Sequence, residues 1–127
     1  MQSRVTYEFA IIRVVPKVER EEFINVGVLV FSKPKKYLEI KYSINNERLR
    51  ALSETLDVKL IEEYLLAWES VCKGAPCGGA IGEFQLADRF RWLAAAKSTI
   101  LQCSPIHSGL CKHPEKELED LFNRYVL

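Results

Sequence analysis

The chain lacks a long apolar run, and its charges nearly cancel. No stretch approaches the roughly 18 apolar residues that a membrane-spanning helix needs. Near the N-terminus, Arg4, Glu8 and Arg13 interrupt the apolar residues that a signal peptide would keep together. The 18 basic and 17 acidic residues leave a net charge of +1, so no global field attracts nucleic acid or a membrane surface. We therefore expect a cytoplasmic protein with no membrane partner.

Residues that bind metals are also scarce and unsuitably spaced. The candidates are four cysteines and two histidines: Cys72, Cys77, Cys103, Cys111, His107 and His113. Four residues separate the first two cysteines, but seven separate the last two, which is not the spacing of a zinc knuckle. In the cytoplasm these thiols stay reduced. We expect neither a metal nor another cofactor.

Alternating apolar and polar side chains predict three consecutive strands. They cover residues 4–15, Ile24–Ser32 and Tyr37–Tyr42. The first strand is apolar on both faces near its end, which is typical of a central strand. The third strand alternates cleanly with charged residues, which indicates a position near the edge. On the second strand, a period of two places Asn25 and Gly27 on the same face.

Helical signals follow the strands. Asn45 or Asn46 is expected to cap a helix over 47–52, and Asp57 a longer helix that ends at Lys73. The remaining predictions are a glycine-rich loop over 74–82, a helix over 85–96, a strand over 98–103, a loop over 104–113 and a last helix from Pro114. This order predicts one α+β domain over residues 1–127. Its sheet is roughly four-stranded, antiparallel or mixed, with helices packed mainly on one face.

Arg13 is the first candidate for a functional residue, because it shares a strand face with apolar neighbours. A buried guanidinium needs a carboxylate or carbonyls around it, and we predict that Glu22 or Glu19 supplies the carboxylate. With Asn25, such a pair can bind a phosphate or carboxylate. The other interpretation, which we favour, is a structural salt bridge that closes the hairpin.

The predicted loop over 104–113 is the second candidate. A serine such as Ser104 near His107 can act as a nucleophile with its base, but no nucleophile elbow surrounds it. In the predicted fold this loop approaches the connection between the first two strands. We therefore predict one ligand-binding site, formed by Arg13, Glu22, Asn25, Ser104 and His107.

Two surfaces are candidates for macromolecular partners. Arg89, Arg91 and Lys97 lie close together in sequence, but scattered basic residues are usually solvated, so nucleic acid is not favoured. Aromatic residues of the kind found at protein interfaces are Tyr37, Phe84 and Trp92. They can equally belong to the core, and the oligomeric state is open.

Five motifs, in their order and spacing, resemble a known family. They cover residues 7–16, 22–28, 89–93, 98–100 and 104–109. Together they resemble the bacterial domain-of-unknown-function family 3037 over nearly the whole chain. The resemblance implies no established activity, substrate or catalytic residue. Genes of this family often neighbour those for HipA-like kinases, so it implies a protein partner in a kinase-linked or toxin–antitoxin-like pair.

The sequence favours a non-enzymatic interaction or regulatory module, because it contains no complete catalytic constellation. The alternative hypothesis is a protein that binds a small anion or a nucleotide. One version of this hypothesis also makes the protein an enzyme. Its polar site would comprise Arg13, Glu22, Asn25 and His107.

Overall fold

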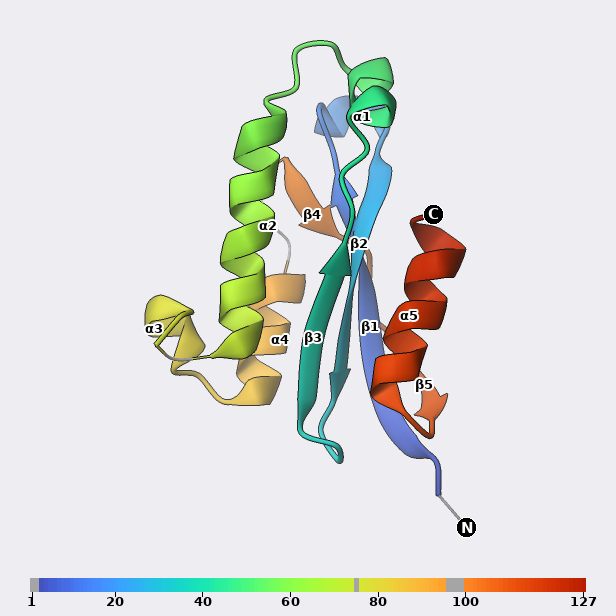
Figure 1. Cartoon of the computed structure of the whole chain (residues 1–127), viewed down its shortest axis with the longest axis vertical. Coiled ribbons are helices and arrows are strands. Elements are labelled where there is room, and N and C mark those ends of the chain that lie inside the picture. The colour runs from blue at the N-terminus through green and yellow to red at the C-terminus, as the bar shows by residue number, and fades with distance from the viewer. Residues whose placement is uncertain (1–2, 75, 96–99) are drawn as a thin grey trace.

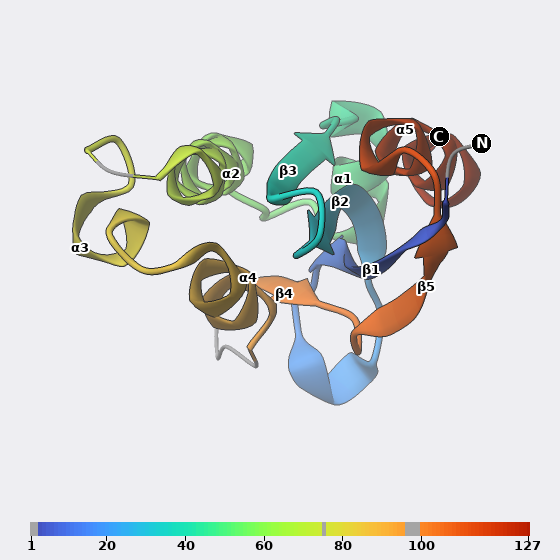
Figure 2. The ribbon, with the colours of Figure 1, turned by 90° about the horizontal axis from the view of Figure 1, so that it is seen from below.

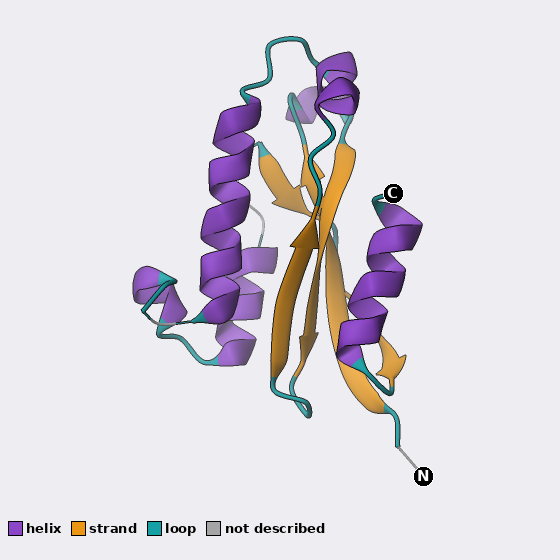
Figure 3. Cartoon of the chain, in the orientation of Figure 1, coloured by secondary structure: helices purple, strands orange, loops and turns teal. Residues whose placement is uncertain are grey.

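The computed structural model describes residues 3–74, 76–95 and 100–127. A central sheet lies between two helical layers (Figures 1 and 3). The elements in chain order are β1 (Val5–Val14), η1 (Val18–Arg20), β2 (Ile24–Ser32), β3 (Tyr37–Tyr42), α1 (Asn46–Leu52), α2 (Val58–Lys73), α3 (Gly79–Gly82), α4 (Leu86–Ala94), β4 (Leu101–Cys103), β5 (His107–Cys111) and α5 (Pro114–Tyr125). The predicted α+β fold is confirmed.

The sheet is antiparallel throughout the described residues and has the order β3-β2-β1-β4, with β5 also paired to β1. β4 and β5 pair with successive parts of β1, so they form one interrupted outer strand. The predicted fourth strand over 98–103 overlaps β4, which begins only at Leu101, and residues 98 and 99 lie outside the described residues. The prediction of a loop over 104–113 is wrong, because half of it pairs with β1 as β5.

β1 is the central strand, as its apolar residues on both faces predict. Ile12 and Val14 pack into the core beneath α2, whereas Tyr7 and Ile11 pack into the core beneath α5. A strand covered on both faces must be apolar on both. β3 forms one edge of the sheet, which was also predicted.

α1, α2 and α4 cover one face of the sheet. Asn45 Oδ1 accepts a hydrogen bond from the Arg48 main-chain N–H at 3.1 Å, and Asp57 Oδ1 accepts one from Leu60 at 3.1 Å, so both predicted caps are present. The buried stripe of α2 repeats at helical spacing: Ile61, Leu65, Trp68, Val71 and Cys72. Among the described residues, no helix is long and apolar enough to cross a membrane.

α5 covers the opposite face, as the view from below shows (Figure 2). Pro114 occupies its first turn, where a missing N–H costs nothing. Its buried residues Leu118, Leu121 and Phe122 pack on Val28 and Val30 of β2. The C-terminal end of α5 therefore lies beside the start of β2.

The glycine-rich stretch predicted as a loop contains the four-residue helix α3. Arg89 from α4 organises this region. Its Nη1 donates to the main-chain carbonyls of Val71 and Cys72, both at 2.8 Å, and its Nε donates to the carbonyl of Phe84 at 3.1 Å. The guanidinium thus adds hydrogen bonds to carbonyls in the last turn of α2, where Val71 also accepts one from the Gly74 N–H.

The predicted basic cluster is mostly committed to the fold. Arg91 forms a two-pronged ion pair with Glu8 of β1, with N–O distances of 2.7 and 2.9 Å. Arg89 caps α2, and Lys97 lies outside the described residues. Neither described arginine presents a freely solvated charge.

Candidate binding pocket

A bulge in β2 determines which way Asn25 points. Ile12 pairs with Gly27, but the next residue, Arg13, pairs with Asn25, so Val26 is an extra residue without a partner in the ladder. A bulge shifts the alternation of side chains by one. Asn25 therefore lies on the face of Arg13, and Gly27 lies on the opposite face. The prediction that Asn25 and Gly27 share a face is wrong for this reason.

Gly27 lies where β2 and β3 approach too closely for a side chain. A Cβ there would lie 2.8 Å from the carbonyl oxygen of Lys41 and 3.0 Å from the Cβ of Tyr42. Real Cβ atoms do not approach a carbonyl oxygen this closely. The glycine thus allows β2 and β3 to pair next to the bulge.

A second irregularity lies on the other side of β1, between β4 and β5. Cys103 pairs with Ile12, and His107 pairs with Phe9. Three residues of the outer strand therefore oppose two residues of β1. This second bulge lies opposite Ala10 and Ile11, next to the position of the first bulge between Ile12 and Arg13.

Ser104 bridges the gap in the ladder. Its main-chain N–H donates to the carbonyl of Ile11 at 2.8 Å. Its hydroxyl accepts from the Ile11 N–H at 2.8 Å and donates to the carbonyl of Pro105 at 2.9 Å. The side chain is 4% exposed. The hydroxyl proton is engaged, so Ser104 holds the edge strand and does not present a nucleophile.

A pocket of about 360 Å³ opens between the two bulges and the end of α5. Its lining residues are Phe9, Ile11, Arg13, Asn25, Ser104, His107, Ser108 and Tyr125. Four of the five residues predicted for the site thus line one pocket. Glu22, the fifth, does not. Ser108 and Tyr125, which were not predicted, also line the pocket.

Arg13 has no acidic partner among the described residues. The predicted pairing with Glu22 or Glu19 is wrong, because Glu22 is exposed and instead accepts a hydrogen bond from Arg20 Nε at 2.6 Å. The Arg13 guanidinium lies over the ring of Phe23, 4.1 Å from its centroid. Within the described chain, its Nε is buried and has no hydrogen-bond partner.

Asn25 is half satisfied. Its Nδ2 donates to the main-chain carbonyl of Tyr125 at 3.1 Å, which ties β2 to the end of α5. Its Oδ1 is buried and, within the described chain, accepts no hydrogen bond. Native structures rarely leave such atoms without a partner. Both residues that carry such an atom line the same pocket.

His107 lies at the rim. Its ring is exposed and tilted against Phe9, with 5.2 Å between the ring centroids. Among the described residues, no carboxylate forms an ion pair with His107, and Ser104 donates its proton elsewhere. A serine–histidine–acid arrangement is therefore not assembled here.

The cysteines and the remaining acidic residues form no cluster at this pocket. Within the described residues, no group of three or more His, Cys, Asp or Glu side chains could hold a metal ion. The four cysteines are free thiols. Burial raises the pKa of the Cys72 thiol to about 12, so it stays protonated as part of the core.

Fold and pocket together define a small α+β protein with a partly polar pocket beside the last helix. The chain belongs to the family described as protein of unknown function (DUF3037), whose model matches residues 9–126. This confirms the resemblance that the motifs carry. No curated protein and no solved structure matches the chain.

Proposed function

We propose that the chain is a non-enzymatic interaction module, and that the pocket beside Arg13 and Asn25 recognises a polar group of a partner protein. One observation carries the proposal. Arg13 and Asn25 both line this pocket, and within the described residues Arg13 Nε and Asn25 Oδ1 are buried without a hydrogen-bond partner. Leaving a polar atom in that state costs about 1–3 kcal/mol. A partner group that draws these side chains toward the pocket and hydrogen-bonds them would offset this cost in the complex.

The surroundings of the pocket suit a protein partner. Phe23, which stacks on Arg13, is 44% exposed, and Tyr125 of the lining is 41% exposed. Ile106, next to His107, is 40% exposed. Aromatic residues around an arginine are the usual composition of binding hot spots. Of the aromatic residues considered from the sequence, Phe84 and Trp92 are exposed, whereas Tyr37 packs against the core beneath α5.

Binding of a small anion or nucleotide is the second candidate function. It is favoured by the guanidinium of Arg13, which pairs with no carboxylate in the described chain. The pocket volume of about 360 Å³ also falls in the range of small-ligand sites, roughly 300–1,000 Å³. In this version His107 and Ser108 at the rim contact the ligand.

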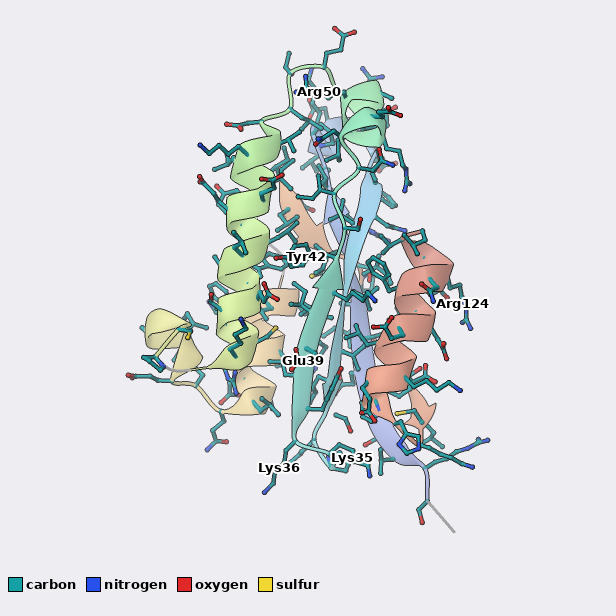
Figure 4. The ribbon with its side chains drawn as sticks, in the orientation of Figure 1. Lys35, Lys36, Glu39, Tyr42, Arg50 and Arg124 are labelled. Carbon is teal, nitrogen blue, oxygen red and sulfur yellow. The ribbon has the colours of Figure 1, made fainter. Side chains whose placement is uncertain are left out.

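The first partner to test is a HipA-like kinase, because the gene neighbourhood that the family resemblance implies points to one. The test is isothermal titration of the purified chain with a purified HipA-like kinase from the same genome. We expect binding that Arg13→Leu weakens at least tenfold, because the pocket loses its only described guanidinium. Arg50→Leu is the matched control, since Arg50 is exposed on α1 and does not line the pocket (Figure 4).

The results separate the candidates. Equal affinity of Arg13→Leu and the native chain would overturn the proposed role of the pocket, provided that both melt at the same temperature. No affinity for the kinase, combined with a thermal shift in phosphate or ATP that Arg13→Leu abolishes, would establish the second candidate. Catalytic turnover that depends on the pocket would refute the non-enzymatic assignment.

A further inference from the structure

The two edges of the sheet differ in how they are protected. β3 carries Glu39 and Lys41, and charged side chains on an edge strand discourage pairing with another chain. β5 forms part of the opposite edge, and its sequence His-Ser-Gly-Leu-Cys contains no charged residue and no proline. Leu110 of β5 is 59% exposed. Among the described strands only β1 pairs with β5, which lies at the margin of the sheet (Figure 2).

The main-chain groups of Ser108 and Leu110 point away from the sheet. Ile11 and Val15, both odd-numbered residues of β1, hydrogen-bond the outer strand through their main-chain groups. Odd-numbered residues of β5 lie opposite odd-numbered residues of β1, so they make the corresponding bonds farther along the strand. The even-numbered residues of β5 therefore turn their N–H and C=O groups outward. This edge offers a short ladder of donors and acceptors to another strand.

Basic side chains flank this edge on both sides of Leu110. Lys33 lines a pocket of about 510 Å³ together with Leu110. Three further basic residues line a second pocket, of about 340 Å³, which Leu110 also borders: Arg4, Lys112 and Lys116. Within the described residues, none of these four basic side chains forms an ion pair.

The acidic residues of the two pockets are mostly engaged in the fold. Glu8 forms an ion pair with Arg91 at 2.7 Å, and Glu117 accepts a hydrogen bond from the Tyr7 hydroxyl at 3.2 Å. Asp120 is the other carboxylate of the two linings. The edge of β5 thus carries an excess of positive charge, although the net charge of the whole chain is only +1.

We propose that the edge of β5 binds an extended, acidic segment of a partner protein as an added strand. The edge shares only its first two residues with the pocket beside Arg13, so this inference goes beyond the proposed function. Outward N–H and C=O groups recognise another extended main chain, whereas a nucleic acid has no matching ladder of amide groups. Acidic side chains on the two faces of the segment pair with Lys33 and with the basic residues of the second pocket.

The test is amide hydrogen exchange of the isotope-labelled chain, followed by NMR. The probe is the synthetic peptide acetyl-Val-Glu-Glu-Val-Glu-Glu-Val-amide, which places carboxylates on both faces of a strand. In the free chain, the outward amides of Ser108 and Leu110 should exchange at least tenfold faster than the inward amide of Gly109. The saturating peptide should slow both outward amides at least tenfold. A peptide with lysine in place of each glutamate should not slow them.

Three results would overturn the proposal. Chemical shift changes without slower exchange would mean that charge attracts the peptide without strand pairing. Equal slowing by the acidic and the basic peptide would remove the preference for acidic segments. Slow exchange of Ser108 and Leu110 in the peptide-free chain, lost on dilution, would show that a second copy of the chain occupies the edge.

Two substitutions separate the main-chain and the charge contributions. Leu110→Pro removes an outward N–H and leaves the ladder with β1 intact, so the fold should persist and the peptide should no longer slow Ser108. Lys112→Glu should weaken the acidic peptide at least threefold, and it decides the question if Leu110→Pro does not fold. Lys59→Glu is the matched control, because Lys59 is exposed on α2 and borders neither pocket. Equal affinity of Lys112→Glu and Lys59→Glu would refute the charge contribution. Arg13→Leu should leave the slowing unchanged, so this proposal and the proposed function fail independently.

Discussion

Ser104→Ala should destabilise the fold without removing a catalytic group. The substitution deletes the oxygen that accepts from the buried Ile11 N–H at 2.8 Å and donates to Pro105 at 2.9 Å. A buried N–H left without an acceptor costs about 1–3 kcal/mol. The bond to Pro105 adds little, because that residue is exposed and water can replace the hydroxyl. We expect the free energy of unfolding to fall by about 2 kcal/mol.

Urea unfolding followed by tryptophan fluorescence measures this change. For a chain of this length, about 2 kcal/mol corresponds to a fall in Tm of roughly 6–10 °C. The slope of free energy against urea should stay constant, because the native and unfolded surfaces change little. Ser108→Ala is the matched control: Ser108 is exposed on β5 and should stay within about 0.5 kcal/mol of the native chain. A Ser104→Ala variant with native stability but without an activity that the native chain shows would refute the structural role. That result would support Ser104 as a nucleophile.

Two further predictions test how the fold is held. Arg89→Leu should lower the free energy of unfolding by about 2–4 kcal/mol, because a half-buried guanidinium donates to three main-chain carbonyls; a urea midpoint equal to that of Arg50→Leu would contradict this. Tyr7 has a pKa raised from 10.0 to about 12, first by burial and then by a neighbouring carboxylate. The folded chain thus keeps a proton that the unfolded chain releases near pH 10, and stability should fall as the pH rises from 10 to 12. Tyr7→Phe should show a shallower fall in pH-dependent urea unfolding, and an identical slope would exclude Tyr7 as a source.

The elements that were predicted correctly have local causes. The caps at Asn45 and Asp57 depend on a side chain and a main-chain N–H three residues apart. The helix that begins at Pro114 and the first three strands likewise follow from short periodic patterns. β5 has no such signal, since its sequence His-Ser-Gly-Leu-Cys is poor in strand-forming residues. It forms a strand because β1, about a hundred residues earlier, leaves its edge open to pairing.

The lining of the pocket was predicted in part for a similar reason. Arg13, Asn25, Ser104 and His107 were grouped because strand order brings their segments together, and they do line one pocket. The carboxylate was misassigned because proximity in sequence does not set the path of a turn. Glu22 lies in a connection that bonds within itself, through Arg20. A cation over the Phe23 ring takes the place of the expected salt bridge, and no local pattern distinguishes the two.

The position of the pocket supports a functional origin more strongly than its residue types do. Both partners of the central strand depart from regular pairing at neighbouring positions along β1, β2 between the partners of Ile12 and Arg13 and the outer strand between those of Phe9 and Ile12. Bulges are enriched beside active and binding sites, because one extra residue can re-aim a side chain. Regular pairing would turn Asn25 into the core beneath α2, where its amide would find only apolar neighbours. The irregular pairing instead places Asn25 beside Arg13 on the sheet face that lines the pocket. A sheet selected for stability alone would satisfy the buried Arg13 Nε and Asn25 Oδ1 internally, which is consistent with the proposed binding role of this face.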